Sequence, residues 1–159
     1  MAWANSKIFR EWVLQVYQVS GTGYTGLDSD TVKVSLHNNS ITPDQDAAVG
    51  STGFNTGVWT TTNEVTDATN WVSGGRSLAS KTFTNAAAAT PMFDAADLAG
   101  GGNVTLASVF GCFVYDDTIT AGTVADQGVS FHYFGGSQGV TAGTFTIIWH
   151  ANGINRYTL

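Results

Sequence analysis

One segment, residues 109–115, restricts the fold more than any other, because its sequence Val-Phe-Gly-Cys-Phe-Val-Tyr leaves it without a polar face. A strand with one solvated face alternates apolar and polar residues, whereas a strand covered on both faces is apolar throughout. We therefore expect residues 109–115 to form a central strand with a layer of protein on each side. Either a second sheet or an N-terminal helix could supply the second layer.

Glycine is abundant and proline is rare, with 19 and 2 residues in a chain of 159. Together with many Thr and Asn residues, this composition favours short strands joined by turns. Val32, Val34 and Leu36 alternate with polar residues, which predicts a strand with one buried and one solvated face. Further strands are expected at residues 80–85, 104–107, 129–134, 144–149 and 155–158. The fold is predicted to be mainly β, a small β-sandwich or flattened barrel with one N-terminal amphipathic α-helix.

The N-terminal part has a helical period instead. Between residues 3 and 19, apolar side chains fall on one helical stripe, at Phe9, Trp12, Val13, Val16 and Tyr17. Asn5 or Ser6 could cap this helix, and the glycines of residues 20–23 are expected to end it. Residues 1–30 are thus an N-terminal helix and turn-rich linker, and residues 31–159 a β domain, within a single compact domain. A short second helix is expected within residues 60–71.

Charge and cysteine content exclude several classes of protein. Six basic residues against 12 acidic ones give a net charge of −6, so there is no cationic face for nucleic acid. A single cysteine, Cys112, cannot form an internal disulfide. No apolar run approaches the roughly 18 residues needed to span a membrane. We expect a protein that is made in, and released from, a cytoplasm and that binds neither nucleic acid nor membrane.

Residues 135–139, Gly-Gly-Ser-Gln-Gly, have the glycine spacing of a hydrolase nucleophile elbow. An elbow places a helix after the serine, whereas a further strand is predicted after Ser137. No acidic residue follows Ser137 to orient His150. We therefore predict a hairpin turn at Ser137.

The sequence also gives little indication of a metal site or a reactive thiol. The three histidines His37, His132 and His150 fall on separate predicted strands, so structural or surface roles are expected. The acidic pairs lie where turns are predicted, at Asp28/Asp30, Asp44/Asp46, Asp94/Asp97 and Asp116/Asp117. Cys112, inside the most apolar segment, is expected to be a buried small hydrophobe. The sequence predicts no catalytic residue, no cofactor and no metal site.

A series of short motifs occurs in order along the chain: Lys33-Val34-Ser35-Leu36, Thr42-Pro43-Asp44, Asn63-Glu64-Val65, Gly74-Gly75-Arg76-Ser77-Leu78, Phe93-Asp94-Ala95-Ala96-Asp97, Val114-Tyr115-Asp116-Asp117 and Gly143-Thr144-Phe145-Thr146-Ile147-Ile148-Trp149. Over residues 33–154 this ordered set resembles a family of tailed-phage virion structural proteins. With the opening Ala2-Trp3-Ala4-Asn5-Ser6-Lys7, it looks most like the capsid decoration (cement) proteins of actinobacteria-infecting phages.

This resemblance implies a non-enzymatic structural protein of the virion. It would bind the major capsid protein on the outer surface of the head lattice and stabilise the shell. It would do so as a homo-oligomer, with a trimer as the first candidate, on the capsid exterior after assembly in the host cytoplasm. The alternative is a minor tail or fibre protein that binds a receptor or glycan, with Trp59, Trp71 and Tyr24 as sugar-stacking platforms. A second alternative is a small hydrolase that uses Ser137 or the acidic pairs.

The N-terminal segment supplies the candidate residues for contact with the capsid or with another subunit. They are Trp3, Lys7, Arg10 and Trp12, because aromatic anchors dominate many interfaces and two of the six basic residues lie outside the acidic β domain. Phe9 and Trp12 could instead dock the helix on its own sheet, which is the favoured interpretation for these two. Trp3 is the better candidate for an outward contact.

Overall fold

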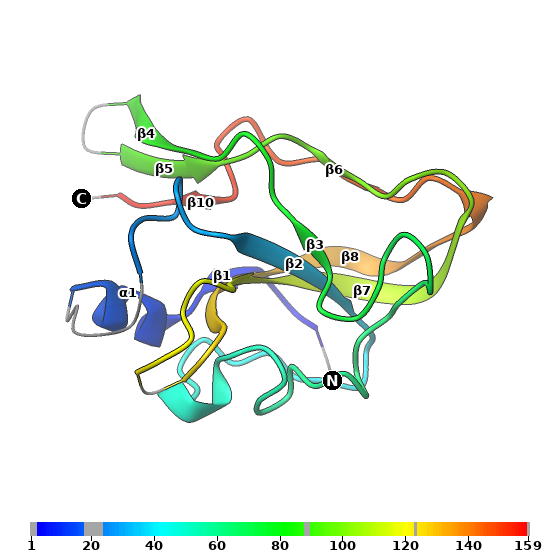
Figure 1. The fold of residues 1–159 in the computed structure, drawn as a ribbon, viewed down its shortest axis with the longest axis horizontal. Coiled ribbons are helices and arrows are strands. Elements are labelled where there is room, and N and C mark those ends of the chain that lie inside the picture. Colours follow the sequence, from blue (N-terminus) through cyan, green and yellow to red (C-terminus); the bar gives the residue numbers. More distant parts are fainter. Residues whose placement is uncertain (1–2, 18–23, 88–89, 123, 159) are drawn as a thin grey trace.

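The computed structural model describes residues 3–17, 24–87, 90–122 and 124–158. Within these ranges the chain is mainly β, with one short α-helix, α1 (Arg10–Tyr17), and one 3-10 helix, η1 (Val49–Ser51). Its strands form antiparallel sheets of five, three and two strands (Figure 1). The predicted mainly β class with an N-terminal helix is confirmed.

The five-stranded sheet has the order β1-β8-β7-β2-β3. Its strands are β1 (Lys7–Ile8), β2 (Val32–His37), β3 (Arg76–Ser77), β7 (Val104–Asp116) and β8 (Gln127–Gly143). β7 lies at the centre, paired with β2 on one side and with β8 on the other. Cys112, Phe113 and Val114 are 0% exposed. The predicted central strand is confirmed, and the strands expected at residues 104–107 and 109–115 are one continuous strand.

The smaller sheets come from the rest of the chain. β10 (Asn155–Arg156), β5 (Thr90–Asp94) and β4 (Thr82–Ala87) form the three-stranded sheet, and β6 (Leu98–Ala99) pairs with β9 (Thr146–Ile147). The strands expected at residues 144–149 and 155–158 are therefore shorter than predicted. The sequence pattern does not indicate β5, because Pro91 cannot donate to a ladder. Its carbonyl still takes part, accepting a hydrogen bond from the N–H of Tyr157 at 2.9 Å.

The helix expected over residues 3–19 is wrong in its first part. Residues 7 and 8 form β1, where Lys7 pairs with Phe131, and the helix begins only at Arg10. The hydroxyl of Ser6, a predicted cap, accepts a hydrogen bond from the N–H of Tyr133 at 2.9 Å. These residues obtain their hydrogen bonds from the sheet edge, so tertiary pairing overrides the helical period. The helix end expected at residues 20–23 lies outside the described residues.

Residues 60–71 form turns, so the short helix expected there is wrong. The Oδ1 atom of Asp67 accepts hydrogen bonds from the N–H groups of Thr69 at 3.0 Å and Asn70 at 3.1 Å. An aspartate that binds the backbone ahead of it stabilises a turn in competition with a helix.

Both faces of β2 are buried, so the solvated face predicted for it is wrong. Ser35 and His37 are 0% exposed. Trp59, in the long loop after β2, packs edge-on against His37 with ring centroids 5.2 Å apart, and Phe9 packs edge-on against the same indole at 5.9 Å. A loop and the N-terminal segment therefore cover this face. In Figure 1, β4, β5 and β10 lie on one side of the five-stranded sheet and the cyan segment after β2 on the other.

Candidate binding groove

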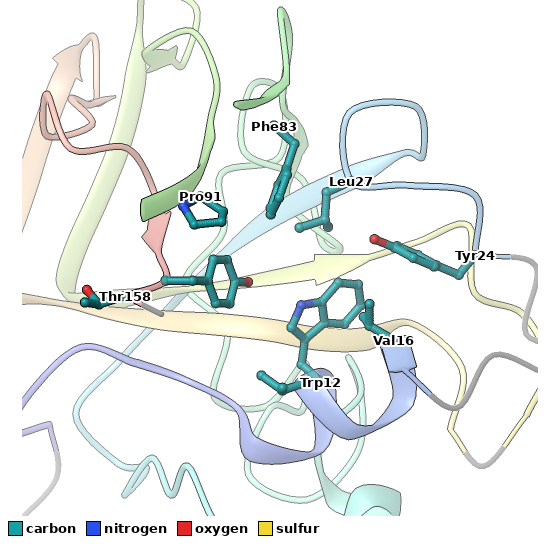
Figure 2. Close-up of a pocket in the computed structure, with 9 residues that line it drawn as sticks. Trp12, Val16, Tyr24, Leu27, Phe83, Pro91 and Thr158 are labelled. Carbon is teal, nitrogen blue, oxygen red and sulfur yellow. The ribbon is translucent and has the colours of Figure 1, made fainter. Parts of the chain in front are cut away.

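An apolar groove lies between α1, the segment that leads into β2, the strands β4 and β5 and the residues after β10 (Figure 2). Its volume is about 480 Å³. The residues that line it, none of them charged, are Trp12, Val13, Val16, Tyr24, Leu27, Phe83, Pro91, Tyr157 and Thr158. They come from segments far apart in the sequence, so only the folded chain creates the groove.

Two aromatic pairs form much of the groove wall. Trp12 meets Tyr24 edge-to-face, with ring centroids 5.4 Å apart and planes at 85°. Phe83 packs against Tyr157 with centroids 6.0 Å apart and planes at 46°. Offset and edge-to-face contacts of this kind are favourable and directional. The rings therefore give the groove a defined shape.

The rim of the groove is also apolar. Val13 on α1 is 36% exposed and Phe83 on β4 is 45% exposed, and both line the groove. Scattered apolar residues are normal on a protein surface, whereas a contiguous apolar patch marks an interaction site. The groove and its rim together form such a patch.

A turn at residues 25–30 carries one wall of the groove, and Asp30 holds this turn. Its Oδ2 atom accepts hydrogen bonds from the N–H groups of Thr25 at 2.9 Å and Gly26 at 3.3 Å. Burial alone would raise the pKa of Asp30, but a hydrogen bond from the Thr25 hydroxyl, together with those from the two N–H groups, lowers it below its ordinary value. Beside the turn, burial and the negative charge of Asp116 raise the pKa of Tyr24, so its hydroxyl stays protonated at neutral pH.

The structure does not bring the four predicted contact residues together. Trp3 is 4% exposed and stacks on Tyr133, and its indole N–H donates to the carbonyl of Asn38 at 2.8 Å. The expectation that Trp3 points outward is therefore wrong. Phe9 and Trp12 are 0% and 2% exposed, so the interpretation that they dock against their own fold is confirmed. Trp12 also lines the groove.

The two basic candidates, Lys7 and Arg10, lie at the surface. Lys7 is exposed on β1 at the edge of the five-stranded sheet. The guanidinium of Arg10 lies 3.1 Å from the carboxylate of Glu11 and 3.9 Å from that of Asp46. Exposed ion pairs contribute about 0–1 kcal/mol to stability, so both cations are available to a partner. Their contact with another molecule stays a prediction.

Ser137 does not lie at a turn between strands, so the hairpin predicted there is wrong. β8 runs through this segment from residue 127 to residue 143, with a left-handed residue at Gly135, where φ is +80°. Ser137 is exposed on this strand. His150 is engaged elsewhere, since its Nδ1 atom accepts a hydrogen bond from the N–H of Asn152 at 3.1 Å. The arrangement is not that of a nucleophile elbow.

Two of the histidines are structural, as predicted. His37 lies 2.9 Å from the hydroxyl of Ser35, and His132 lies 3.0 Å from that of Ser130. Burial lowers the pKa of His37 to about 3 and that of His132 to about 4, so both imidazoles are neutral at physiological pH. In the ranges that the structure describes, no group of three or more His, Cys, Asp or Glu side chains could hold a metal ion.

The remaining candidates divide between core and turns. Cys112 is 0% exposed and burial raises the pKa of its thiol, so its role as a buried hydrophobe is confirmed. Asp44 accepts a hydrogen bond from the N–H of Asp46 at 2.9 Å, as expected for turn chemistry. Trp59 and Trp71 are both 1% exposed, so their proposed use as sugar-stacking platforms is wrong.

Comparison with known proteins found no match among family models, curated proteins or solved structures. In the part of the chain with described positions, no helix has the length and apolar character needed to cross a membrane.

Proposed function

We propose that this chain is a structural protein of a tailed-phage virion and decorates the outer surface of the head. The resemblance of its ordered motifs to such proteins supports this function. The observation that carries it further is the uncharged groove with its exposed rim of Val13 and Phe83. An apolar segment of the major capsid protein would fill the groove and bury the rim.

A small apolar interface at each site is sufficient to hold a decoration protein on an assembled shell. A protein that binds the assembled lattice but not its free subunits stabilises the lattice by mass action. A homo-oligomer, with a trimer as the first candidate, engages several lattice sites at once, so a modest affinity at each site becomes a strong overall attachment. The low charge of the chain, with only 11% charged residues, suits close packing on such a surface.

The first experiment is the copy number of the protein in purified virions, by quantitative mass spectrometry against the major capsid protein. A ratio near one, or a simple fraction set by local symmetry axes, is expected for a decoration protein. A few copies per particle would favour the alternative, a minor tail or fibre protein. Absence from the particle would overturn the structural role.

The second experiment locates the contact by binding purified variants to undecorated heads. Val13→Ser and Phe83→Ser are expected to weaken binding at least tenfold, because each places a hydroxyl in the buried apolar interface. Ile148→Ser is the matched control, since Ile148 is 76% exposed and lies outside the groove. Deletion of the N-terminal segment is not a suitable test, because Trp3 and Phe9 belong to the core. Equal binding by all three variants would exclude the groove as the contact.

A further inference from the structure

Two carboxyl groups that are far apart in the sequence meet inside the protein. Asp30 ends the turn before β2, and Asp116 ends β7. Their residues are 3% and 0% exposed. Asp116 pairs with Val32 in the ladder between β7 and β2, and the N–H of Asp117 donates to the carbonyl of Thr31 at 2.8 Å, so the two buried carboxyls are neighbours. A hydrogen bond between two carboxyl groups needs a proton on one of them, because an ionised carboxylate only accepts.

The hydrogen bonds around the pair show which carboxyl group is the better placed to carry a negative charge. Asp30 accepts from the N–H groups of Thr25 and Gly26 and also from the Thr25 hydroxyl. Asp116 accepts at Oδ1 from the N–H of Thr118 at 3.0 Å, whereas its buried Oδ2 atom has no donor among the described residues. A buried charge without donors is costly. The negative charge therefore belongs on Asp30 and the proton on Asp116.

The other charged and titratable groups nearby do not neutralise the pair. Tyr24 and Asp28 lie on the same segment as Asp30, and neither can supply a positive charge. On the adjoining strand, Lys33 is engaged with Asp117, whose carboxylate lies 2.8 Å from its ammonium group. Asp126 lies near that ion pair and adds further negative charge. None of these groups therefore supplies the positive charge that would favour a second ionisation of the pair.

We propose that Asp30 and Asp116 share one proton that latches the turn at residues 25–30 onto the end of β7, and that loss of this proton loosens one wall of the groove. The turn carries Leu27, which is 3% exposed and lines the groove. Tyr24, next to the turn, packs on Trp12 (Figure 2). Two like charges in place of a hydrogen bond would push the turn away from the sheet. This latch does not depend on the proposed function.

The direction of the pH effect follows from the folded and unfolded states. Burial and the neighbouring Asp30 raise the pKa of Asp116 to about 7, whereas a free aspartate has a pKa of about 4. Between about pH 4 and pH 7, Asp116 therefore keeps its proton in the folded chain, whereas it has lost its proton in the unfolded chain. Stability from this group is complete below about pH 4 and is lost as the pH rises to about 7.

The test follows the two carboxyl carbons of the full-length chain by NMR from pH 3 to pH 9. The pair is expected to titrate in two steps, one below pH 4 and one near pH 7. In parallel, hydrogen exchange is measured at the amides of Thr25 and Gly26 and corrected for the intrinsic effect of pH. Their protection is expected to fall at least tenfold between pH 5 and pH 8.

Asp116→Asn is the decisive variant, because the amide stays neutral and can donate to Asp30 at every pH. Protection of the two amides is expected to become independent of pH in this variant. Asp97→Asn, at an exposed aspartate outside the turn and β7, is the matched control and should keep the wild-type profile. The proposal is overturned if both wild-type carboxyls titrate below pH 5, or if Asp116→Asn loses protection as the wild type does. If Asp116→Asn does not fold, the carboxyl titration of the wild type decides.

Discussion

The indole of Trp59 lies flat on the ring of Phe113, with ring centroids 4.5 Å apart and planes at 14°. Phe113 lies on the central strand β7, whereas Trp59 belongs to the loop between β2 and β3. Both residues are buried, at 1% and 0% exposed. A residue outside every strand thus completes the core of the five-stranded sheet.

Removal of this indole should cost a large part of the stability. Trp59→Ala is expected to lower the free energy of unfolding by about 3–5 kcal/mol, because it leaves a cavity against Phe113. Urea denaturation followed by circular dichroism measures the change. Ile148→Ala, at a side chain that is 76% exposed, should stay within about 0.5 kcal/mol of wild type. Similar losses in both variants would contradict the role given to Trp59.

Gly75 is a second position where a small change should be costly. Its φ is +72°, and a Cβ atom there would overlap the carbonyl oxygen of Val34 on β2. Gly75→Ala is expected to destabilise the fold by more than about 2 kcal/mol, through backbone strain and this overlap. Thermal unfolding compares it with Gly102→Ala, where nothing lies within 4 Å of the added Cβ. Equal melting temperatures would show that the chain relaxes around Gly75 at no cost.

The sequence predicts the centre of the fold better than its cover. β7 is recognisable because successive apolar residues require burial on both faces. The cover over β2 is not recognisable, because a loop residue such as Trp59 follows no hydrophobic period. Ser35 and His37 do alternate with apolar residues along β2, so the sequence pattern predicts that they face solvent. They are buried instead, and a hydrogen bond of 2.9 Å joins their side chains.

The groove and the carboxyl pair depend on contacts between distant segments. Val13 and Val16 lie on the predicted helical stripe, yet their partner Phe83 comes from β4 and gives no local signal. Asp30 and Asp116 are each explained in the sequence as turn residues, and Asp116 does accept from the N–H of Thr118. Only the pairing of β7 with β2 brings the two carboxyls together. Local sequence patterns contain no information on contacts between residues that are so far apart in the sequence.

His37 should make the fold sensitive to acid. Burial lowers its pKa to about 3, so the folded chain stays unprotonated where the unfolded chain, with a pKa near 6.5, binds a proton. Stability from this residue is complete above about pH 6.5 and falls by up to about 1.4 kcal/mol per pH unit towards pH 3. His37→Gln is expected to flatten the dependence of unfolding free energy on pH over this window.

The measurement compares urea denaturation at several pH values between pH 3 and pH 7. His132 and Asp116 also contribute to the pH dependence of the unfolding free energy, Asp116 with the opposite sign. These contributions are similar in every variant, so the informative quantity is the difference between the variants in that pH dependence. His150→Gln, at an exposed histidine, should keep the wild-type slope. An unchanged slope in His37→Gln would show that this imidazole takes up a proton without unfolding.

The groove should bind a small apolar probe before any partner is identified. The dye ANS gains fluorescence in apolar sites, and the groove offers about 480 Å³ lined by uncharged residues. Phe83→Ser is expected to lower the bound fluorescence several-fold while the free energy of unfolding changes by less than about 1 kcal/mol, since Phe83 is 45% exposed. Ile148→Ser tests whether any exposed apolar residue has the same effect. Because Ile148 lies outside the groove, its replacement should leave the dye signal intact, and a loss equal to that of Phe83→Ser would place the dye elsewhere on the surface.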